Sequence, residues 1–152
     1  MTFSTADVLS CTEGQLLAGT GKAWYSAVTC DSRTAQPGSL FFALKGAHTD
    51  GHQFVGDAVA RGARGAVVNY LPSGSLGEAD LIAVKDPLRA LGALATWCLG
   101  KANVARVAVT GSAGKTTTKE MTARVLATRY RVCATPENYN TEIGVPLTAC
   151  DL

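Results

Sequence analysis

The sequence predicts an α/β protein with a small mixed-sheet domain over residues 1–100 and the first βαβ unit of a second domain over residues 101–152. Three observations support this fold class. Short apolar runs alternate with segments of helical periodicity, and glycine and proline separate them. Hydrophobic residues make up 47% of the chain and charged residues 17%. That balance indicates a folded protein with a hydrophobic core.

Four strands are expected in the first domain, because four short runs rich in apolar, aromatic and β-branched residues lie between turn signals. They cover residues 23–29, 40–44, 66–68 and 81–84. The second run (LFFAL) follows the turn signal Pro37-Gly38 and has no polar residue, which is typical of a strand buried on both faces. The stretch before the first strand contains Gly14, Gly19 and Gly21 and is expected to form a loop.

Three helices are expected in the same domain, over residues 6–10, 51–62 and 87–99. Ser4 or Thr5 can cap the first helix, and Gly62 suits the C-terminal cap of the second. Asp86-Pro87 is a favourable N-cap and first-turn pair for the third helix, which Gly100 is expected to end. Strands and helices in this order describe a small α/β domain with a mixed sheet.

A second α/β unit is expected to begin after a short linker at residues 101–103. It comprises a strand over residues 104–109, a helix over residues 116–128 and a strand over residues 130–134. This is one βαβ unit, whereas a doubly wound sheet needs several. We therefore expect the second domain to be cut off shortly after it begins, so that the chain is part of a larger protein.

The loop at residues 110–117 (TGSAGKTT) is the most specific motif of the chain. Its glycines let backbone N–H groups surround an anion, and the following helix directs its positive end to the same point. Lys115 can reach β- and γ-phosphates, and the Thr116 hydroxyl is placed to ligate Mg²⁺. The usual spacing needs glycine where this chain has Val109, so the loop is a variant that begins at Gly111.

ATP or GTP is the expected ligand of this loop, and the second domain is therefore expected to be a P-loop ATP-binding domain. The residues expected to bind the nucleotide are Gly111, Ser112, Ala113, Gly114, Lys115, Thr116 and Thr117.

Composition argues against several other classes of protein. No apolar run approaches the roughly 18 to 20 residues that span a bilayer, and no export signal opens the chain, so we expect no membrane insertion. Five scattered cysteines without a C-x-x-C pair are typical of reduced thiols in the cytoplasm. A net charge of +2 without a Lys/Arg cluster does not favour a nucleic-acid partner. His48 and His52 lack an evident third ligand for a metal.

Taken together, these motifs resemble the Mur ligases, the ATP-dependent amide-forming enzymes of peptidoglycan synthesis. Residues 110–117 match the T-G-x-x-G-K-T-T loop of that family. Residues 31–33 (DSR), 37–46 (PGSLFFALKG) and 50–54 (DGHQF) resemble the N-terminal UDP-sugar-binding domain of the members that add the third residue or the terminal dipeptide. Residues 119–121 (KEM) and 138–148 (NYNTEIGVPLT) look most like the member that joins D-alanyl-D-alanine to UDP-N-acetylmuramoyl-tripeptide.

The resemblance implies a two-step ligation that uses ATP and Mg²⁺. ATP phosphorylates the terminal carboxylate of the UDP-linked tripeptide, and the amine of D-alanyl-D-alanine attacks the acyl phosphate. Lys115 would stabilise charge on the transferring phosphoryl group, and Thr116 would hold Mg²⁺. The 152 residues alone are expected to bind ligands without turnover, as the N-terminal part of the enzyme.

The same resemblance implies a substrate-binding role for loop residues in both domains. They are Ser32, Arg33, Ala47, His48, Thr49, Asn138 and Asn140. Hydroxyls and backbone N–H groups at loop tips are suitable donors for a uracil or a diphosphate. On the residues alone, Ser32 is more readily a turn residue, and Arg33 can equally form a structural ion pair with Asp31.

Two other functions stay open. The neighbouring Mur ligase, which adds lysine or diaminopimelate as the third residue, shares the DSR region and the phosphate loop, so only residues 138–146 argue against it. A non-catalytic nucleotide-binding or UDP-sugar-binding module is the other alternative, because no second acidic motif follows the phosphate loop to supply further Mg²⁺ ligands.

Overall fold

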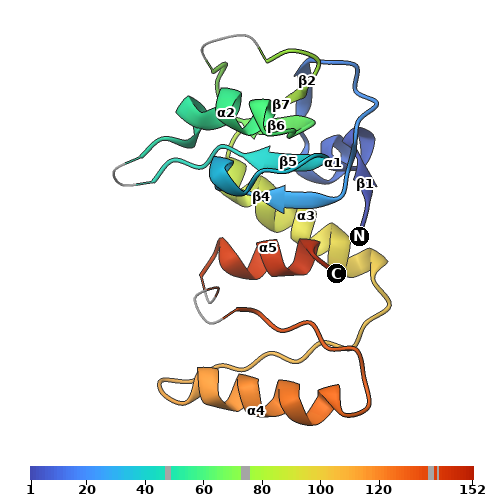
Figure 1. Cartoon of the computed structure of the whole chain (residues 1–152), viewed down its shortest axis with the longest axis vertical. Coiled ribbons are helices and arrows are strands. Elements are labelled where there is room, and N and C mark those ends of the chain that lie inside the picture. The colour runs from blue at the N-terminus through green and yellow to red at the C-terminus, as the bar shows by residue number, and fades with distance from the viewer. Residues whose placement is uncertain (47–48, 73–75, 137–138, 140) are drawn as a thin grey trace.

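The computed structural model describes residues 1–46, 49–72, 76–136, 139 and 141–152 (Figure 1). These residues form an α/β fold in which a five-stranded sheet has helices on both of its faces. A second sheet of two strands lies at its side. The predicted α/β class is confirmed.

The larger sheet is mixed, with the strand order β2-β7-β6-β5-β4. Its four strands β4 to β7 are parallel, whereas β2 pairs antiparallel with β7. β1 and β3 form the small antiparallel sheet. The strands are β1 (Phe3–Ser4), β2 (Gln15–Ala18), β3 (Trp24–Tyr25), β4 (Ala27–Thr29), β5 (Ser39–Phe42), β6 (Gly65–Val68) and β7 (Asp80–Ala83).

The hydrophobic core lies on both faces of the larger sheet, because successive side chains of a strand point to opposite faces. On β5, Leu40 and Phe42 pack with residues of α1 and α3, whereas Phe41 packs with residues of α2 on the other face. The helices are α1 (Thr5–Thr12), α2 (Val55–Ala60), α3 (Pro87–Lys101), α4 (Lys115–Ala127) and α5 (Gly144–Cys150), with the short 3₁₀ helices η1 (Ser32–Thr34) and η2 (Gly51–Phe54).

The predicted helix caps are confirmed at two sites. The Ser4 hydroxyl accepts a hydrogen bond from the Asp7 N–H (3.3 Å), and the Asp7 carboxylate accepts one from the Ser4 N–H (2.8 Å), which completes a capping box at α1. Asp86 caps α3 through the N–H of Leu88 (2.9 Å). The prediction that Gly100 ends α3 is wrong by one residue, because the helix runs to Lys101.

Two predictions about the first domain are wrong in detail. The strand expected over residues 23–29 is divided at Ser26, because β3 pairs with β1 while β4 pairs with β5. The loop expected around Gly14 and Gly19 contains the strand β2. All four residues of β2 are exposed at a sheet edge, so its sequence lacks the alternation of buried and exposed residues that identifies a strand.

The second unit departs further from the prediction. Its helix is confirmed as α4, but residues 104–110 and 131–136 form no β-ladder with any described residue. Figure 1 shows both segments running in the same direction and opposite to α4, which is the path of a βαβ unit. An isolated pair of parallel strands would leave its apolar side chains and its free hydrogen-bonding edges in water. Val107 is accordingly 67% exposed.

The last helix, α5, packs against α3 of the first domain. Its residues Ala149 and Cys150 are buried in the same hydrophobic cluster as Leu94 and Cys98 of α3. The C-terminal segment therefore returns to the first domain and covers part of its core (Figure 1). Within the described residues, no helix has both the length and the hydrophobicity that crossing a membrane requires.

Candidate functional site

The phosphate loop leads directly into α4. Gly111 (φ 153°) and Gly114 (φ 76°) adopt backbone conformations that residues with a side chain rarely adopt, and Gly114 is the N-cap of α4. Among the described residues, no side chain caps this helix end. Its first backbone N–H groups are therefore available to an anion, and the helix dipole favours negative charge at the same place.

Lys115 adds a full positive charge to this loop. Its Nζ donates a hydrogen bond to the carbonyl oxygen of Gly111 (2.5 Å), so the side chain folds back across the loop that it follows in sequence. Thr116 and Thr117 are exposed in the first turn of α4. Local chain geometry therefore brings together all seven residues that the sequence predicts for nucleotide binding, 111–117.

α4 is tied to the segment that follows it by Lys119. The Lys119 Nζ donates to the carbonyl oxygen of Thr135 and forms an ion pair with Glu120 (2.9 Å). Only 20% of the Lys119 side chain is exposed. This contact holds residues 131–136 against α4, although no ladder forms there.

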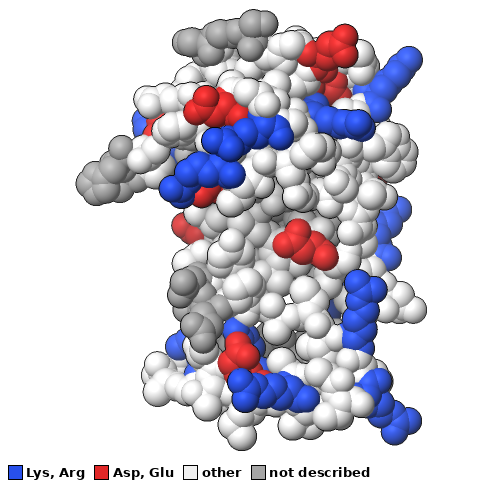
Figure 2. Space-filling model, viewed as in Figure 1, with Lys and Arg blue, Asp and Glu red and all other residues white. Residues whose placement is uncertain are grey.

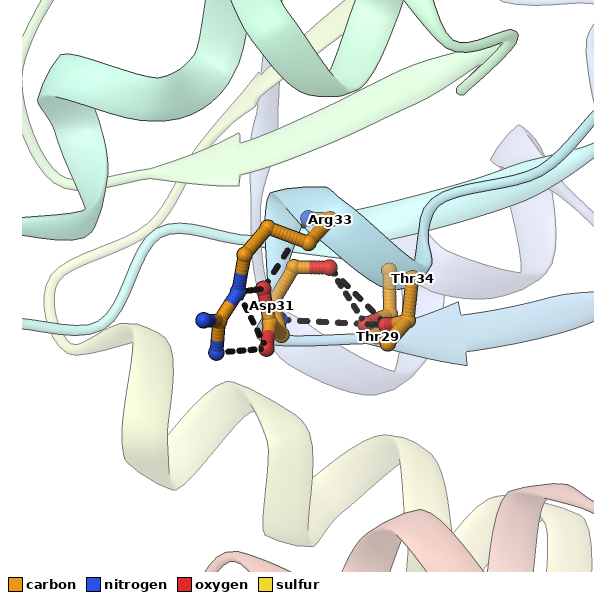
Figure 3. A network of polar contacts seen from close by, with 4 residues as sticks. All are labelled: Thr29, Asp31, Arg33 and Thr34. Carbon is orange, nitrogen blue, oxygen red and sulfur yellow. Dashed lines mark hydrogen bonds and ion pairs between the residues drawn. The ribbon is translucent and has the colours of Figure 1, made fainter.

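A polar network occupies the turn after β4 (Figure 3). The hydroxyls of Thr29 and Thr34 are 2.7 Å apart, and the Thr29 hydroxyl accepts a hydrogen bond from the N–H of Asp31 (3.0 Å). Ser32 is buried in this turn, at 8% exposure. The network gives the turn at the carboxyl end of a parallel strand a defined shape, and ligands bind at that end of such sheets.

Arg33 forms the ion pair with Asp31 that the sequence left as one alternative. The Arg33 Nε lies 2.9 Å and its terminal nitrogen 2.7 Å from the two carboxylate oxygens of Asp31, and the backbone N–H of Arg33 also donates to Asp31 (2.9 Å). The Arg33 side chain is 83% exposed, so it stays accessible to a ligand while it is oriented by Asp31. Side-chain and backbone hydrogen bonds from Arg33 lower the pKa of Asp31 to about 2.

The Asp31 carboxylate should titrate near pH 2 in an NMR experiment, below its ordinary value of 3.8. Because its pKa is lower in the folded state, the stabilisation from this pair is present above about pH 4 and is lost as the pH falls through 2. Arg33→Gln should move the midpoint upward. A midpoint near 3.8 in the wild-type protein would contradict the ion pair.

A cleft of about 220 Å³ adjoins this polar turn. Thr29 and Thr34 line it from the first domain, and Tyr139, Leu147 and Asp151 line it from the C-terminal segment. None of these five residues was predicted from the sequence to be a site residue. The hydroxyl side chains on either side of the DSR motif were an available signal, but the approach of the C-terminal segment depends on the packing of α5.

Of the remaining predicted substrate residues, the structure describes Thr49. Thr49 is exposed, and its carbonyl oxygen accepts a hydrogen bond from the N–H of Gly46 (2.8 Å). The predicted residues Ala47, His48, Asn138 and Asn140 lie outside the described residues. The structure therefore brings Ser32 and Arg33 together in one turn and leaves Thr49 on a separate one.

Charge and possible metal ligands are dispersed over the molecule. On the face drawn in Figure 2, Lys and Arg are interspersed with Asp and Glu instead of forming one continuous track. In the part of the chain that the structure describes, no three His, Cys, Asp or Glu side chains come together to hold a metal ion. All five cysteines are free thiols.

Two family models match separate stretches of the chain. The Mur ligase family, catalytic domain, matches residues 25–96, and the Mur ligase middle domain matches residues 109–152. The boundary between the two matches lies between α3 and the phosphate loop.

Two curated relatives that match this chain carry the same enzyme name. The UDP-N-acetylmuramoyl-tripeptide--D-alanyl-D-alanine ligase of Treponema pallidum is 40% identical over 96% of this chain and 34% of its own length. The enzyme of the same name from Escherichia coli is 44% identical over 80% of this chain and 26% of its own length. The chain thus spans about a quarter to a third of the length of these two curated relatives.

Solved structures show the same fold. MurF from Acinetobacter baumannii superposes on the whole chain with a TM-score of 0.85 at 32% identity, and this chain covers 33% of it. MurF from Thermotoga maritima, solved in complex with ADP, matches 82% of this chain and 29% of its own chain with a TM-score of 0.71 at 34% identity. Two models of one family match separate stretches of this chain, and the Treponema pallidum relative is 40% identical over 96% of it. The chain therefore belongs to the Mur ligase family.

Proposed function

We propose that this chain serves an ATP-dependent ligase that joins D-alanyl-D-alanine to UDP-N-acetylmuramoyl-tripeptide. The observation that carries the proposal is the 40% identity over 96% of the chain to a relative named for that reaction. We further propose that residues 1–100 are a UDP-substrate domain and that residues 101–152 begin a P-loop ATP-binding domain. The separate family matches on either side of residue 101 support this division.

The phosphate loop fits ATP and Mg²⁺. Three features of the loop form a cationic site for phosphates. They are the glycines with positive φ, the N-terminus of α4, which no described side chain caps, and the Lys115 ammonium. The exposed Thr116 hydroxyl is a hard oxygen ligand of the kind that Mg²⁺ prefers. ATP would supply the phosphoryl group that activates the peptide carboxylate, and the ADP bound to the Thermotoga maritima MurF supports a nucleotide here.

The role of this chain in the reaction is positioning and charge neutralisation. Lys115 would balance the negative charge on the transferring phosphoryl group, and Gly111 to Gly114 would hold the phosphates through their N–H groups. We assign the substrate's uridine diphosphate to the first domain, where Ser32, Arg33 and Thr49 present hydroxyl, guanidinium and backbone donors. Ala47, His48, Asn138 and Asn140 complete the proposed substrate set.

A second candidate is the ligase that adds diaminopimelate. The UDP-N-acetylmuramoyl-L-alanyl-D-glutamate--2,6-diaminopimelate ligase of Chlorobaculum tepidum is 36% identical over 69% of this chain. Its match is shorter and less identical than the one to the Treponema pallidum enzyme. Comparing D-alanyl-D-alanine with diaminopimelate as the amine substrate of the complete enzyme separates the two candidates. Incorporation of diaminopimelate alone would overturn the proposal.

Calorimetric titration of the 152-residue protein tests the assignment of its two sites. We expect UDP and Mg·ATP to bind at the same time with one site each and without ATP turnover. The free thiols are consistent with a reducing cytoplasm, so the titrations belong in reducing buffer. Competition of UDP with ATP for one site would contradict the two-domain assignment, and ligation by the chain alone would contradict the need for further residues.

A further inference from the structure

Asp50, His52 and Tyr70 form a connected polar cluster at the end of the sheet where Thr49 lies. Asp50 Oδ1 accepts hydrogen bonds from His52 Nδ1 (2.7 Å) and from the backbone N–H of His52 (3.0 Å). Asp50 Oδ2 accepts one from the Tyr70 hydroxyl (2.6 Å). The rings of His52 and Tyr70 stack at 3.9 Å with an interplanar angle of 12°. The three side chains therefore fix one another's positions.

The cluster is anchored in the protein interior by His52, whose side chain is 2% exposed. His52 Nε2 accepts a hydrogen bond from the backbone N–H of Asn69 (3.2 Å), directly after β6. An Nε2 that accepts leaves the ring proton on Nδ1, which donates it to Asp50. The bonds to Asp50 hold the pKa of its carboxyl at about 2, with the Tyr70 hydroxyl as the largest cause.

This arrangement does not suit acid–base catalysis. Both ring nitrogens of His52 are occupied, one by Asp50 and one by the Asn69 N–H, and the imidazole is buried. The Tyr70 hydroxyl is also committed to Asp50. A general base must have a nitrogen or oxygen free to reach a substrate proton. The cluster is therefore suited to holding a backbone segment in place.

The segment held by the cluster is the turn that ends at Thr49 and Asp50. Asp50 forms an antiparallel bridge with Lys45, and the N–H of Gly51 donates to the carbonyl oxygen of Leu44 (2.9 Å). A Cβ at Gly51 would lie 2.8 Å from the backbone of Leu44, so only glycine permits this close approach. Asp50 thus links the base of the turn to the end of β6 through His52. Through Tyr70 it also links the turn to the segment that follows β6.

We propose that Asp50, His52 and Tyr70 are positioning residues that hold Thr49 in place to bind the uridine diphosphate part of the substrate. The proposal rests on the proposed function, which assigns Thr49 to that ligand. Fixing a turn before the ligand arrives removes the cost of ordering it on binding, so the effect falls on affinity. The cluster joins two segments 20 residues apart, and its one removable, solvent-accessible member is the Tyr70 hydroxyl.

Tyr70→Phe tests the proposal, because it deletes the hydroxyl and keeps the ring stacked on His52. Tyr130→Phe is the matched control, since Tyr130 is another exposed tyrosine, in the second unit. UDP is titrated into each protein with saturating Mg·ADP present, so that the phosphate loop is filled. We expect Tyr70→Phe to weaken UDP binding roughly fivefold, because the turn must then be ordered as the ligand binds. Tyr130→Phe should bind as the wild type does.

Two further measurements separate positioning from general damage. ADP affinity and the melting temperature should be unchanged in Tyr70→Phe, while amide hydrogen exchange at residues 45, 46 and 49–51 should accelerate. Unchanged UDP affinity in Tyr70→Phe, with binding intact in the wild type, overturns this inference alone. If the wild-type protein does not bind UDP, the inference fails together with the assignment of the first domain to the UDP-linked substrate. ADP binding then still tests the assignment of the second domain to ATP.

Discussion

Lys115→Ala is expected to lower ATP-dependent ligation by the complete enzyme by about three orders of magnitude, as loss of a charge-stabilising group in phosphoryl transfer does. The Lys115 ammonium lies over the phosphate loop, bonded to the Gly111 carbonyl, and no other Lys or Arg lies within residues 110–118. Its loss leaves the N–H groups of the loop and the helix dipole to balance the phosphates. Those partial charges support binding better than they support the developing charge of the transferring group.

The expected loss is in kcat more than in KM for ATP, and steady-state kinetics with both amine and nucleotide varied measure the two. Lys85→Ala is the matched control, because Lys85 is an exposed lysine in the first domain, remote in sequence from the loop. It should retain activity within about twofold, as surface substitutions usually do. Near-normal turnover in Lys115→Ala would exclude Lys115 from the role in phosphoryl transfer that we propose for it.

Features set by neighbouring residues could be predicted from the sequence. The N-cap at Ser4, the cap at Asp86 and the buried strand expected at residues 40–44 each depend on a short stretch of chain. All three are present, the strand over Ser39–Phe42. The helix after the phosphate loop is confirmed as α4, whereas the strand expected before the loop does not form within the described residues. Local chemistry of this kind needs no knowledge of the rest of the fold.

Features set by distant contacts could not be predicted. β2 exists as a strand because β7 offers it an edge some 65 residues later in the sequence, and its own residues are all exposed. The strands expected on either side of α4 are absent because no described neighbouring strand completes a sheet there. The Arg33–Asp31 pair was foreseen as one alternative, whereas the cleft beside it depends on the approach of Tyr139 and α5.

Among the charged residues of the first domain, Asp80 is the one whose replacement should lower the free energy of unfolding most. Its carboxylate is 1% exposed, and no Lys or Arg forms an ion pair with it in the described residues. Instead it accepts hydrogen bonds from the Thr5 hydroxyl (2.5 Å) and from the backbone N–H groups of Gly21 (2.9 Å) and Ala23 (3.3 Å). One buried carboxylate thus joins β7, the start of α1 and the loop before β3.

The close packing around Asp80 also explains one glycine. Gly19 has a φ of 93°, and a Cβ there would lie 2.3 Å from Asp80 Oδ1. Both the backbone conformation and the contact require glycine at this position. The loop around residues 19–23 is therefore shaped to wrap the carboxylate, which the sequence pattern alone could not show because the partners lie 57 to 75 residues apart.

Asp80→Ala is expected to lower the free energy of unfolding by about 3 kcal/mol, because it leaves buried donors without an acceptor and opens a small cavity. Asp80→Asn should fall between this variant and the wild type. Its amide oxygen can still accept from one N–H, but its NH₂ group must face donors that the second carboxylate oxygen now satisfies. Urea unfolding followed by circular dichroism measures all three proteins.

The exposed Glu78 provides the control, since it lies two residues before Asp80, in the turn that leads into β7. Glu78→Ala should change the free energy of unfolding by less than about 0.5 kcal/mol, because a solvated carboxylate leaves no buried donor behind when it is removed. If Asp80→Ala were as stable as Glu78→Ala, the three donors would have to find other acceptors in the folded protein. Water that enters beside Thr5 would supply such acceptors. Its entry would require the loop at residues 19–23 to detach from β7, which faster amide exchange at Gly21 and Ala23 would reveal.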